Sequence, residues 1–245
     1  MSCHHSSYFK KNDLKPHLQK MWCIGKINAE FIARMEQILQ LYGLQPDEKQ
    51  PLVCFDEKSY QVLGDTIAPI PMQPGKPARY SEKYLRHGTH QVFVAYMPLI
   101  GKRFVWVNPT RKAVDFAFFF KYFMEHYLPT VCPEYKCVRV VMDNLNTHTT
   151  ASFYKAFDPQ TALELANKVQ FYFTPVNASW LNIAEIEIHA ISVQCLHRRM
   201  KEQKTVSTEI QALVQDRNDN CIKTNWQFSI PDAREKFQRF YADLY

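Results

Sequence analysis

The order of the expected elements predicts an α/β protein, with a mixed sheet and helices on both of its faces. Short apolar runs rich in β-branched residues alternate with stretches that carry apolar residues at helical spacing. Two early runs are joined through a glycine, as in a β-hairpin, whereas helical stretches separate the later runs. Hairpin strands followed by alternating helices and strands give a sheet that is partly antiparallel and partly parallel.

Three elements carry most of this prediction. Residues 29–42 form an apolar stripe at helical spacing, with Asn28 as the N-cap. The apolar run 52–55 predicts a buried strand that delivers Asp56 at its carboxyl end, and the run 137–142 is a second strand ending in an aspartate. The other expected elements are a loop over 67–78, a hairpin over 90–98 and 103–108, a helix over 113–128 ended by Pro129, a strand over 168–173, a helix over 181–200, and two C-terminal helices, one around Val206 and one after Pro231.

The composition is that of a globular protein. Of the 245 residues, 46% are apolar and 14% aromatic, so the chain can bury a sizeable core. No apolar stretch approaches the roughly 18–20 residues of a membrane span, and the start of the chain lacks the apolar core of a secretory signal. Seven irregularly spaced cysteines indicate reduced thiols in a cytoplasmic protein without a membrane partner. The net charge of +6 permits a polyanionic partner without proving one.

Three acids stand where the predicted elements could bring them together. Asp56 and Asp143 follow strands, and Glu185 opens the long helix. Ligands of open α/β sheets gather at the carboxyl ends of strands. Crowded carboxylates repel one another unless a divalent cation neutralises them, and hard oxygen ligands suit Mg²⁺ or Mn²⁺. Taken singly, each acid also fits a structural role in a turn or in a first helical turn.

Four motifs resemble transposases of the insertion-sequence 630 family, bacterial relatives of the mariner elements. They are Phe55-Asp56-Glu57-Lys58, Pro74-Gly75-Lys76-Pro77-Ala78-Arg79-Tyr80, Val141-Met142-Asp143-Asn144-Leu145-Asn146-Thr147-His148 and Ser179-Trp180-Leu181-Asn182-Ile183-Ala184-Glu185-Ile186-Glu187. The resemblance covers about residues 10–241. It implies a ribonuclease-H-like catalytic domain that uses two Mg²⁺ or Mn²⁺ ions. Such a domain cuts double-stranded DNA at the terminal inverted repeats of an element and joins the ends to target DNA, usually at a TA dinucleotide.

The resemblance assigns the catalytic and metal-binding roles to Asp56, Asp143 and Glu185. The spacing between Asp143 and Glu185 is longer than in mariner-type relatives, which keeps Glu187 open as the alternative third acid. Residues 185 and 187 lie about 200° apart on a helix, so both cannot face one cleft. Glu187 has the more apolar helical neighbours, and we therefore expect Glu185 in the site.

Polar and basic residues near these acids are candidates for contacts with DNA. Asn146 and His148 could contact the scissile phosphate, orient Asp143 or simply form a polar turn. A basic group after the long helix could follow a phosphate backbone or be a solvated surface; it comprises Arg198, Arg199, Lys201 and Lys204. The family context is also compatible with a homodimer and with a nucleoid-associated location in the cytoplasm.

We expect three segments along the chain. Residues 1–50 form a basic N-terminal segment and linker helix, 51–204 the catalytic domain, and 205–245 C-terminal helices packed on it. Transposases of this family carry helix-turn-helix modules ahead of the catalytic domain, whereas one good helix precedes Asp56 here, so we expect a truncated start. One alternative is a non-catalytic DNA-binding or regulatory remnant. Another ribonuclease-H-like nuclease, such as a resolvase, fits the long motifs less well.

Overall fold

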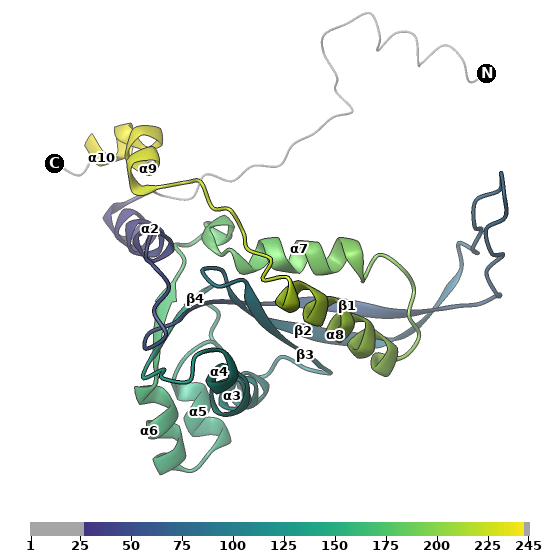
Figure 1. Cartoon of the computed structure of the whole chain (residues 1–245), viewed down its shortest axis with the longest axis horizontal. Helices are drawn as coiled ribbons and strands as arrows, with labels where there is room; N and C mark the ends of the chain where they lie inside the picture. The colour runs from purple at the N-terminus through teal and green to yellow at the C-terminus, as the bar shows by residue number, and fades with distance from the viewer. Residues whose placement is uncertain (1–26, 243–245) are drawn as a thin grey trace, which may run out of the picture.

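The fold is a twisted sheet between two layers of helices (Figure 1). The computed structural model describes residues 27–242. Within them the sheet has five strands in the order β3-β2-β1-β4-β5. β2 pairs antiparallel with both β1 and β3, whereas β4 pairs parallel with both β1 and β5. The predicted mixed sheet with helices on both faces is therefore confirmed.

The elements alternate along the chain as expected for this architecture. The strands are β1 Leu52–Asp65, β2 Tyr84–Met97, β3 Lys102–Asn108, β4 Val138–Met142 and β5 Val169–Phe173. The helices are α2 Ala29–Tyr42, α3 Ala113–Tyr122, η1 Phe123–Tyr127, α4 Leu128–Val131, α5 Ala151–Ala156, α6 Pro159–Asn167, η2 Ser179–Leu181, α7 Ala184–Gln194, α8 Gln203–Asp219, α9 Ile230–Lys236 and α10 Gln238–Ala242. The lysines expected in the basic N-terminal segment, from Lys10 to Lys26, lie outside the described residues.

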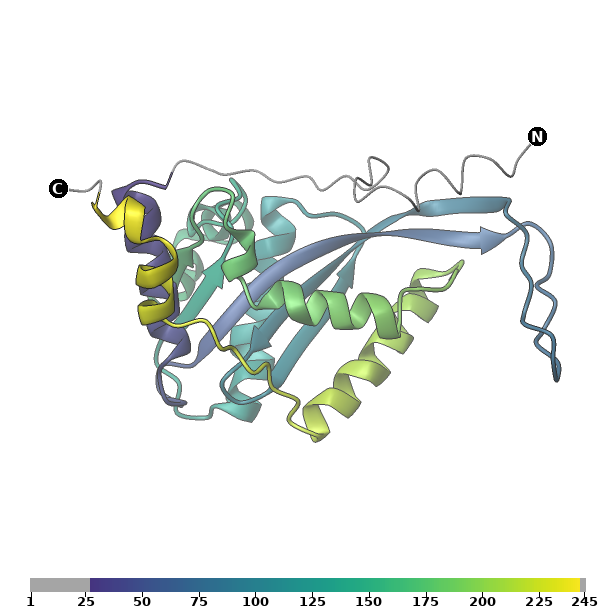
Figure 2. The same ribbon diagram turned by 90° about the horizontal axis from the view of Figure 1, so that it is seen from above.

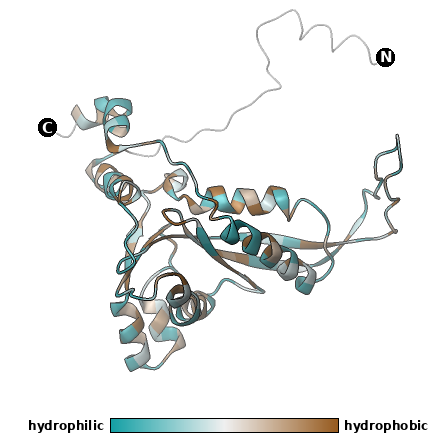
Figure 3. Cartoon of the chain, viewed as in Figure 1, coloured by the Kyte–Doolittle hydropathy of each residue, from teal (hydrophilic) through white to brown (hydrophobic). Residues whose placement is uncertain are grey.

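Two hydrophobic cores lie on opposite faces of the sheet. Because successive residues of a strand point to opposite faces, β1 contributes to both cores. Val53 and Phe55 pack against the aromatic residues of α3, whereas Leu52 and Cys54 face α7 and α2. Figure 3 shows hydrophobic residues along the strands and on the helices that cover them. Within residues 27–242, no helix is both long and apolar enough to cross a membrane.

β1 and β2 continue beyond the sheet as a narrow two-stranded arm that ends in the loop 66–83 (Figure 2). Arg199 anchors the base of this loop, at the far end of the arm. Its guanidinium group donates to Asp65 Oδ1 and to the Ser81 carbonyl, both at 2.8 Å, and lies over the rings of Tyr80 and Tyr84. The loop predicted over 67–78 is thus the tip of a long hairpin.

The first predicted strand is too short. Residues 52–55 were expected to end the strand before Asp56, but β1 runs on to Asp65. Pairing with β4 does stop at Cys54, but β2 continues to pair with β1 on its other side. Asp56 therefore lies inside β1, two residues beyond the end of the parallel pairing.

Two predicted helix ends are also wrong. The helix expected to stop before Pro129 continues through the wide π turn η1 into α4. Pro129 stands in the first turn of α4 and has no N–H to donate to the preceding π turn, whose Met124 carbonyl accepts a hydrogen bond from the Tyr135 hydroxyl at 2.6 Å. The helix expected over 181–200 is the short η2 followed by α7, which ends at Gln194. Beyond it, Leu196 and Met200 enter the core from irregular chain.

Two helices between β4 and β5 were not predicted. α5 packs on α3, α6 packs on α5 and β5, and both helices contribute to the aromatic core. The start of α6 carries a recognisable signal, because Asp158 accepts a hydrogen bond from the Thr161 amide and Pro159 follows it. Over the other face of the sheet, α2 contacts β5 and α9 packs on α2, with Phe31 and Phe237 in edge-to-face contact.

A buried ionic group joins α7 to the hairpin and to α8. Glu187 is completely buried and receives two hydrogen bonds from Arg217, at 2.8 and 2.9 Å. The guanidinium of Arg103, also completely buried, lies 3.1 Å from the same carboxylate. A buried charge is tolerated only when it is paired, so this contact fixes the rotation of α7 about its axis. Glu187 consequently points away from solvent, and Glu185 stays exposed.

We expect Glu187→Gln to destabilise the protein strongly, because it leaves two arginines without their shared counter-charge. Loss of one partner from a buried ionic group costs about 3–5 kcal/mol. Urea unfolding of Glu187→Gln measures this loss, and Glu185→Gln, an exposed acid on the same helix, is the matched control. Equal unfolding midpoints for the two variants would contradict this role of Glu187.

Candidate active site

Asp56 and Asp143 emerge from neighbouring parallel strands at one edge of the sheet. Leu52 to Cys54 pair in register with Arg139 to Val141, so both strands reach this edge together. Asp56 follows two residues after Cys54, and Asp143 directly follows the last residue of β4. The two aspartates therefore lie where ligands of such sheets gather.

Asn182 ties the start of α7 to the same edge. Its side chain is buried, and its Nδ2 donates to the carbonyl of Phe55 at 2.8 Å. Its Oδ1 accepts from the amide of Ala184 at 3.2 Å, and its carbonyl accepts from the amide of Glu185 at 3.0 Å. The hydroxyl of Tyr42 holds the preceding residue, since it donates to the Leu181 carbonyl at 2.6 Å. These contacts bring Glu185, in the first turn of α7, next to the β1 segment that carries Asp56.

The three acids share one electrostatic environment. Burial raises the pKa of Asp56 to about 7, and the charges of Glu57, Asp143 and Glu185 add to this increase. A hydrogen bond from the Glu57 amide to Asp56 Oδ1, at 2.8 Å, opposes it. A hydrogen bond from His148 lowers the pKa of Asp143, which is half-buried. The surroundings therefore disfavour the negative charge of Asp56 and favour that of Asp143.

The donor set suits a divalent cation of the Mg²⁺ type. Asp56, Asp143 and Glu185 offer only carboxylate oxygens, which are the ligands that Mg²⁺ and Mn²⁺ prefer. Within the described residues, no three acidic, histidine or cysteine side chains converge tightly enough to form a ready-made metal cage. Mutual repulsion keeps uncompensated carboxylates apart, and a cation that neutralised them would remove that repulsion. The donor atoms of the site therefore fit a divalent cation. The raised pKa of Asp56 reflects the negative charge that such a cation would neutralise.

The structure separates Glu187 from this group, because its carboxylate is held by two arginines on the far side of α7. It also places His148 behind Asp143 rather than on the surface, with only 2% of the residue exposed. This burial argues against the predicted contact of His148 with DNA and favours the alternative that it orients Asp143. Asn146 is exposed in the turn after Asp143.

The basic residues after α7 divide into two kinds. The guanidinium of Arg199 is bonded at the base of the loop 66–83, so it is not free to contact a phosphate. Arg198 lies 2.6 Å from Glu209 and is half exposed, and both Lys201 and Lys204 are exposed. Three of the four predicted phosphate contacts are therefore accessible.

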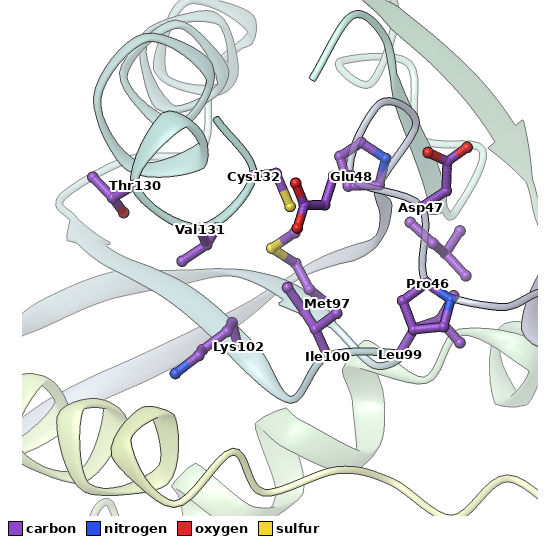
Figure 4. A pocket seen from close by; sticks show the side chains of 12 residues that line it. Pro46, Asp47, Glu48, Met97, Leu99, Ile100, Lys102, Thr130, Val131 and Cys132 are labelled. Atoms are coloured by element: carbon purple, nitrogen blue, oxygen red, sulfur yellow. The ribbon is translucent and has the colours of Figure 1, made fainter. Parts of the chain in front are cut away.

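A cavity of about 390 Å³ adjoins the acids, and another lies apart from them. The first is lined by Asp143, Asn144 and the segment 174–177, among others. The second, of about 470 Å³, lies near the start of β1, between the loop that carries Asp47 and Glu48 and the end of α4 (Figure 4). Burial, together with the charges of Glu48 and Asp47, raises the pKa of the Cys132 thiol that lines it. The second cavity contains none of the candidate site residues.

Comparison with known proteins agrees with this geometry. A family model described as DDE superfamily endonuclease matches residues 51–207, and no curated protein sequence matches the chain. The chain is similar in structure to the Mos1 mariner paired-end complex with Mn, at a TM-score of 0.57 and 17% identity, over 97% of this chain and 69% of that one. It is also similar to the Mos1 transposase paired-end complex with left transposon end, at 0.55 and 15%, over 97% and 69%. The Mos1 paired-end complex with Mg gives 0.52 and 16%, over 98% and 68%.

At these identities the structural similarity establishes the fold, and the predicted ribonuclease-H-like architecture is confirmed. The family model covers more than half of the chain and includes Asp56, Asp143 and Glu185. The chain belongs to the DDE superfamily endonuclease family.

Proposed function

We propose that this chain is the catalytic domain of a transposase, which cuts DNA at transposon ends and transfers the strand to a target. The observation that carries the proposal is the placement of the half-buried Asp56 beside Asp143 and Glu185 at the carboxyl edge of β1 and β4, where burial and the neighbouring acids raise the pKa of Asp56. A cluster of acids with one strongly perturbed pKa marks a candidate functional site. The motifs of the insertion-sequence 630 family favour that subgroup, with terminal inverted repeats and a TA target as its DNA.

In this proposal Asp56, Asp143 and Glu185 hold two Mg²⁺ or Mn²⁺ ions. When bound, such a pair activates a water or 3′-hydroxyl and stabilises the leaving oxygen of the phosphodiester. The chain keeps the acids in position through Asn182, which joins α7 to β1, and through Glu187, which fixes the rotation of α7. Burial disfavours the ionised form of Asp56, and a cation held by the three acids would stabilise that form.

The acids provide the direct test. We expect Asp56→Asn, Asp143→Asn and Glu185→Gln each to reduce Mn²⁺-dependent cleavage of a supercoiled plasmid by about 100-fold or more, because loss of even an outer-shell partner costs 10–100-fold. Each substitution keeps the shape of the side chain and removes one charged oxygen ligand. Glu164→Gln, an exposed acid on α6, is the control and should cleave like the wild type. Wild-type protein that folds and binds DNA without cleaving it would favour the non-catalytic remnant.

The exposed basic residues suggest how the DNA backbone passes the site. Arg198, Lys201 and Lys204 follow α7, whose first turn carries Glu185, and α7 packs along β1 away from the acids. Contacts of lysine and arginine with phosphates release counterions and give affinity that is independent of sequence. Asn146, exposed beside Asp143, is the candidate contact closest to the scissile phosphate.

We expect alanine at Arg198, Lys201 or Lys204 to weaken DNA binding uniformly across sequences. Each variant should reduce the slope of log affinity against log salt by about 1, because one phosphate contact is lost. A salt titration of fluorescently labelled duplexes measures this slope. Arg199→Ala should instead lower the melting temperature and leave the slope unchanged, since Arg199 is tied to Asp65 and the arm. A reduced slope for Arg199→Ala alone would reverse this assignment.

A further inference from the structure

His148 is an imidazole enclosed by two aromatic rings directly behind Asp143. Its ring stacks on Phe116, with centroids 5.0 Å apart and planes at 23°, and meets the edge of Phe55 at 5.3 Å. Only 2% of the residue is exposed. Such a position is suited to an apolar side chain, and a polar ring there needs partners for both of its nitrogens.

Both nitrogens have a carboxylate partner. Nδ1 lies 2.6 Å from Asp143 Oδ1, and Nε2 lies 3.1 Å from Glu57 Oε2. Burial disfavours the charged ring, but the hydrogen bond with Asp143 and the charges of Asp143 and Glu57 outweigh it and raise the pKa of His148 to about 9. The charged imidazole therefore donates a hydrogen bond to Asp143 through Nδ1 and faces Glu57 through Nε2 as an ion pair, without the geometry of a second hydrogen bond.

The second carboxylate comes from the residue next to Asp56. Neighbouring residues of β1 point to opposite faces of the sheet, so Asp56 faces the acid cluster while Glu57 points toward α3 and His148. The side chain of Glu57 is only 5% exposed, and its nearest other cation, Arg111, lies 3.7 Å away at the surface. The ion pair with His148 therefore fixes the orientation of both the Glu57 carboxylate and the His148 ring.

A tight turn returns His148 to Asp143. The amide of His148 donates to the carbonyl of Leu145 at 2.8 Å, and Ser152 supports the turn by donating to the Thr147 carbonyl at 2.7 Å. The turn brings the His148 ring to Oδ1 of Asp143. The other carboxylate oxygen, Oδ2, does not take part in this hydrogen bond.

We propose that Glu57 and His148 act as a clamp that positions Asp143 for the metal, so that His148 is a positioning residue and not a DNA contact. The inference rests on the proposed function of the acids. Metal-binding carboxylates are commonly oriented by such outer partners, whose loss weakens metal affinity about 10–100-fold. A histidine that only filled the aromatic core would need neither acid, and a phosphate contact would need an exposed ring.

The test is Mn²⁺ affinity, measured by electron paramagnetic resonance of the free ion, in wild type, His148→Gln, Glu57→Gln and the double variant. We expect His148→Gln to weaken Mn²⁺ binding about 10–100-fold. Glu57→Gln should weaken it in the same direction, because Glu57 acts on Asp143 through the ring. The double variant should bind like His148→Gln, since Glu57 has no effect once the ring is gone.

Tyr135→Phe is the control, because it removes a part-buried hydrogen bond, 2.6 Å long, to the Met124 carbonyl beside the same aromatic core without touching Asp143 or the turn that carries His148. It should lower stability and keep wild-type affinity for Mn²⁺. Wild-type affinity in folded His148→Gln, or an equal loss in Tyr135→Phe, would overturn the clamp alone. If circular dichroism shows that His148→Gln does not fold, unchanged affinity in Glu57→Gln would overturn it. Wild-type protein that binds no Mn²⁺ would overturn the proposed function, and the clamp with it.

Discussion

The crowding of carboxylates at the shared edge of β1 and β4 is the constraint on which the rest of the structure depends. Parallel pairing brings Asp56 and Asp143 to one place, and Asn182 brings the helix that carries Glu185 to the same β1 segment. These charges repel one another, and burial further disfavours the ionised form of Asp56. Secondary structure alone does not hold like charges together, so the surroundings must fix each acid from outside the group.

Buried polar side chains hold the candidate acids in place. Asn182 bonds the carbonyl that precedes Asp56, and the paired Glu187 sets the rotation of α7. His148 engages one oxygen of Asp143. The contacts of Asn182 and Glu187 join elements that are distant in sequence, whereas His148 contacts Asp143 from five residues further along the chain.

The sequence predicted the sheet better than the contacts that surround the candidate acids. Asp143 follows an apolar run, and Glu185 opens a helix, so simple patterns identify both. The partner of Asn182 is the carbonyl of a residue in another strand, which no local pattern reveals. The length of β1 depends on β2, and the ends of α7 depend on core packing. Charge was also a poor guide to exposure, because His148 and Arg199 are occupied within the fold.

The measurement that tests the account most directly is a crystal structure of the protein soaked in Mn²⁺, with anomalous scattering to locate the ions. The account predicts two peaks about 4 Å apart, bounded by Asp56, Asp143 and Glu185, with His148 still in contact with Asp143. Peaks at other acids, or a metal bound through a rotated Glu187 instead of Glu185, would contradict it.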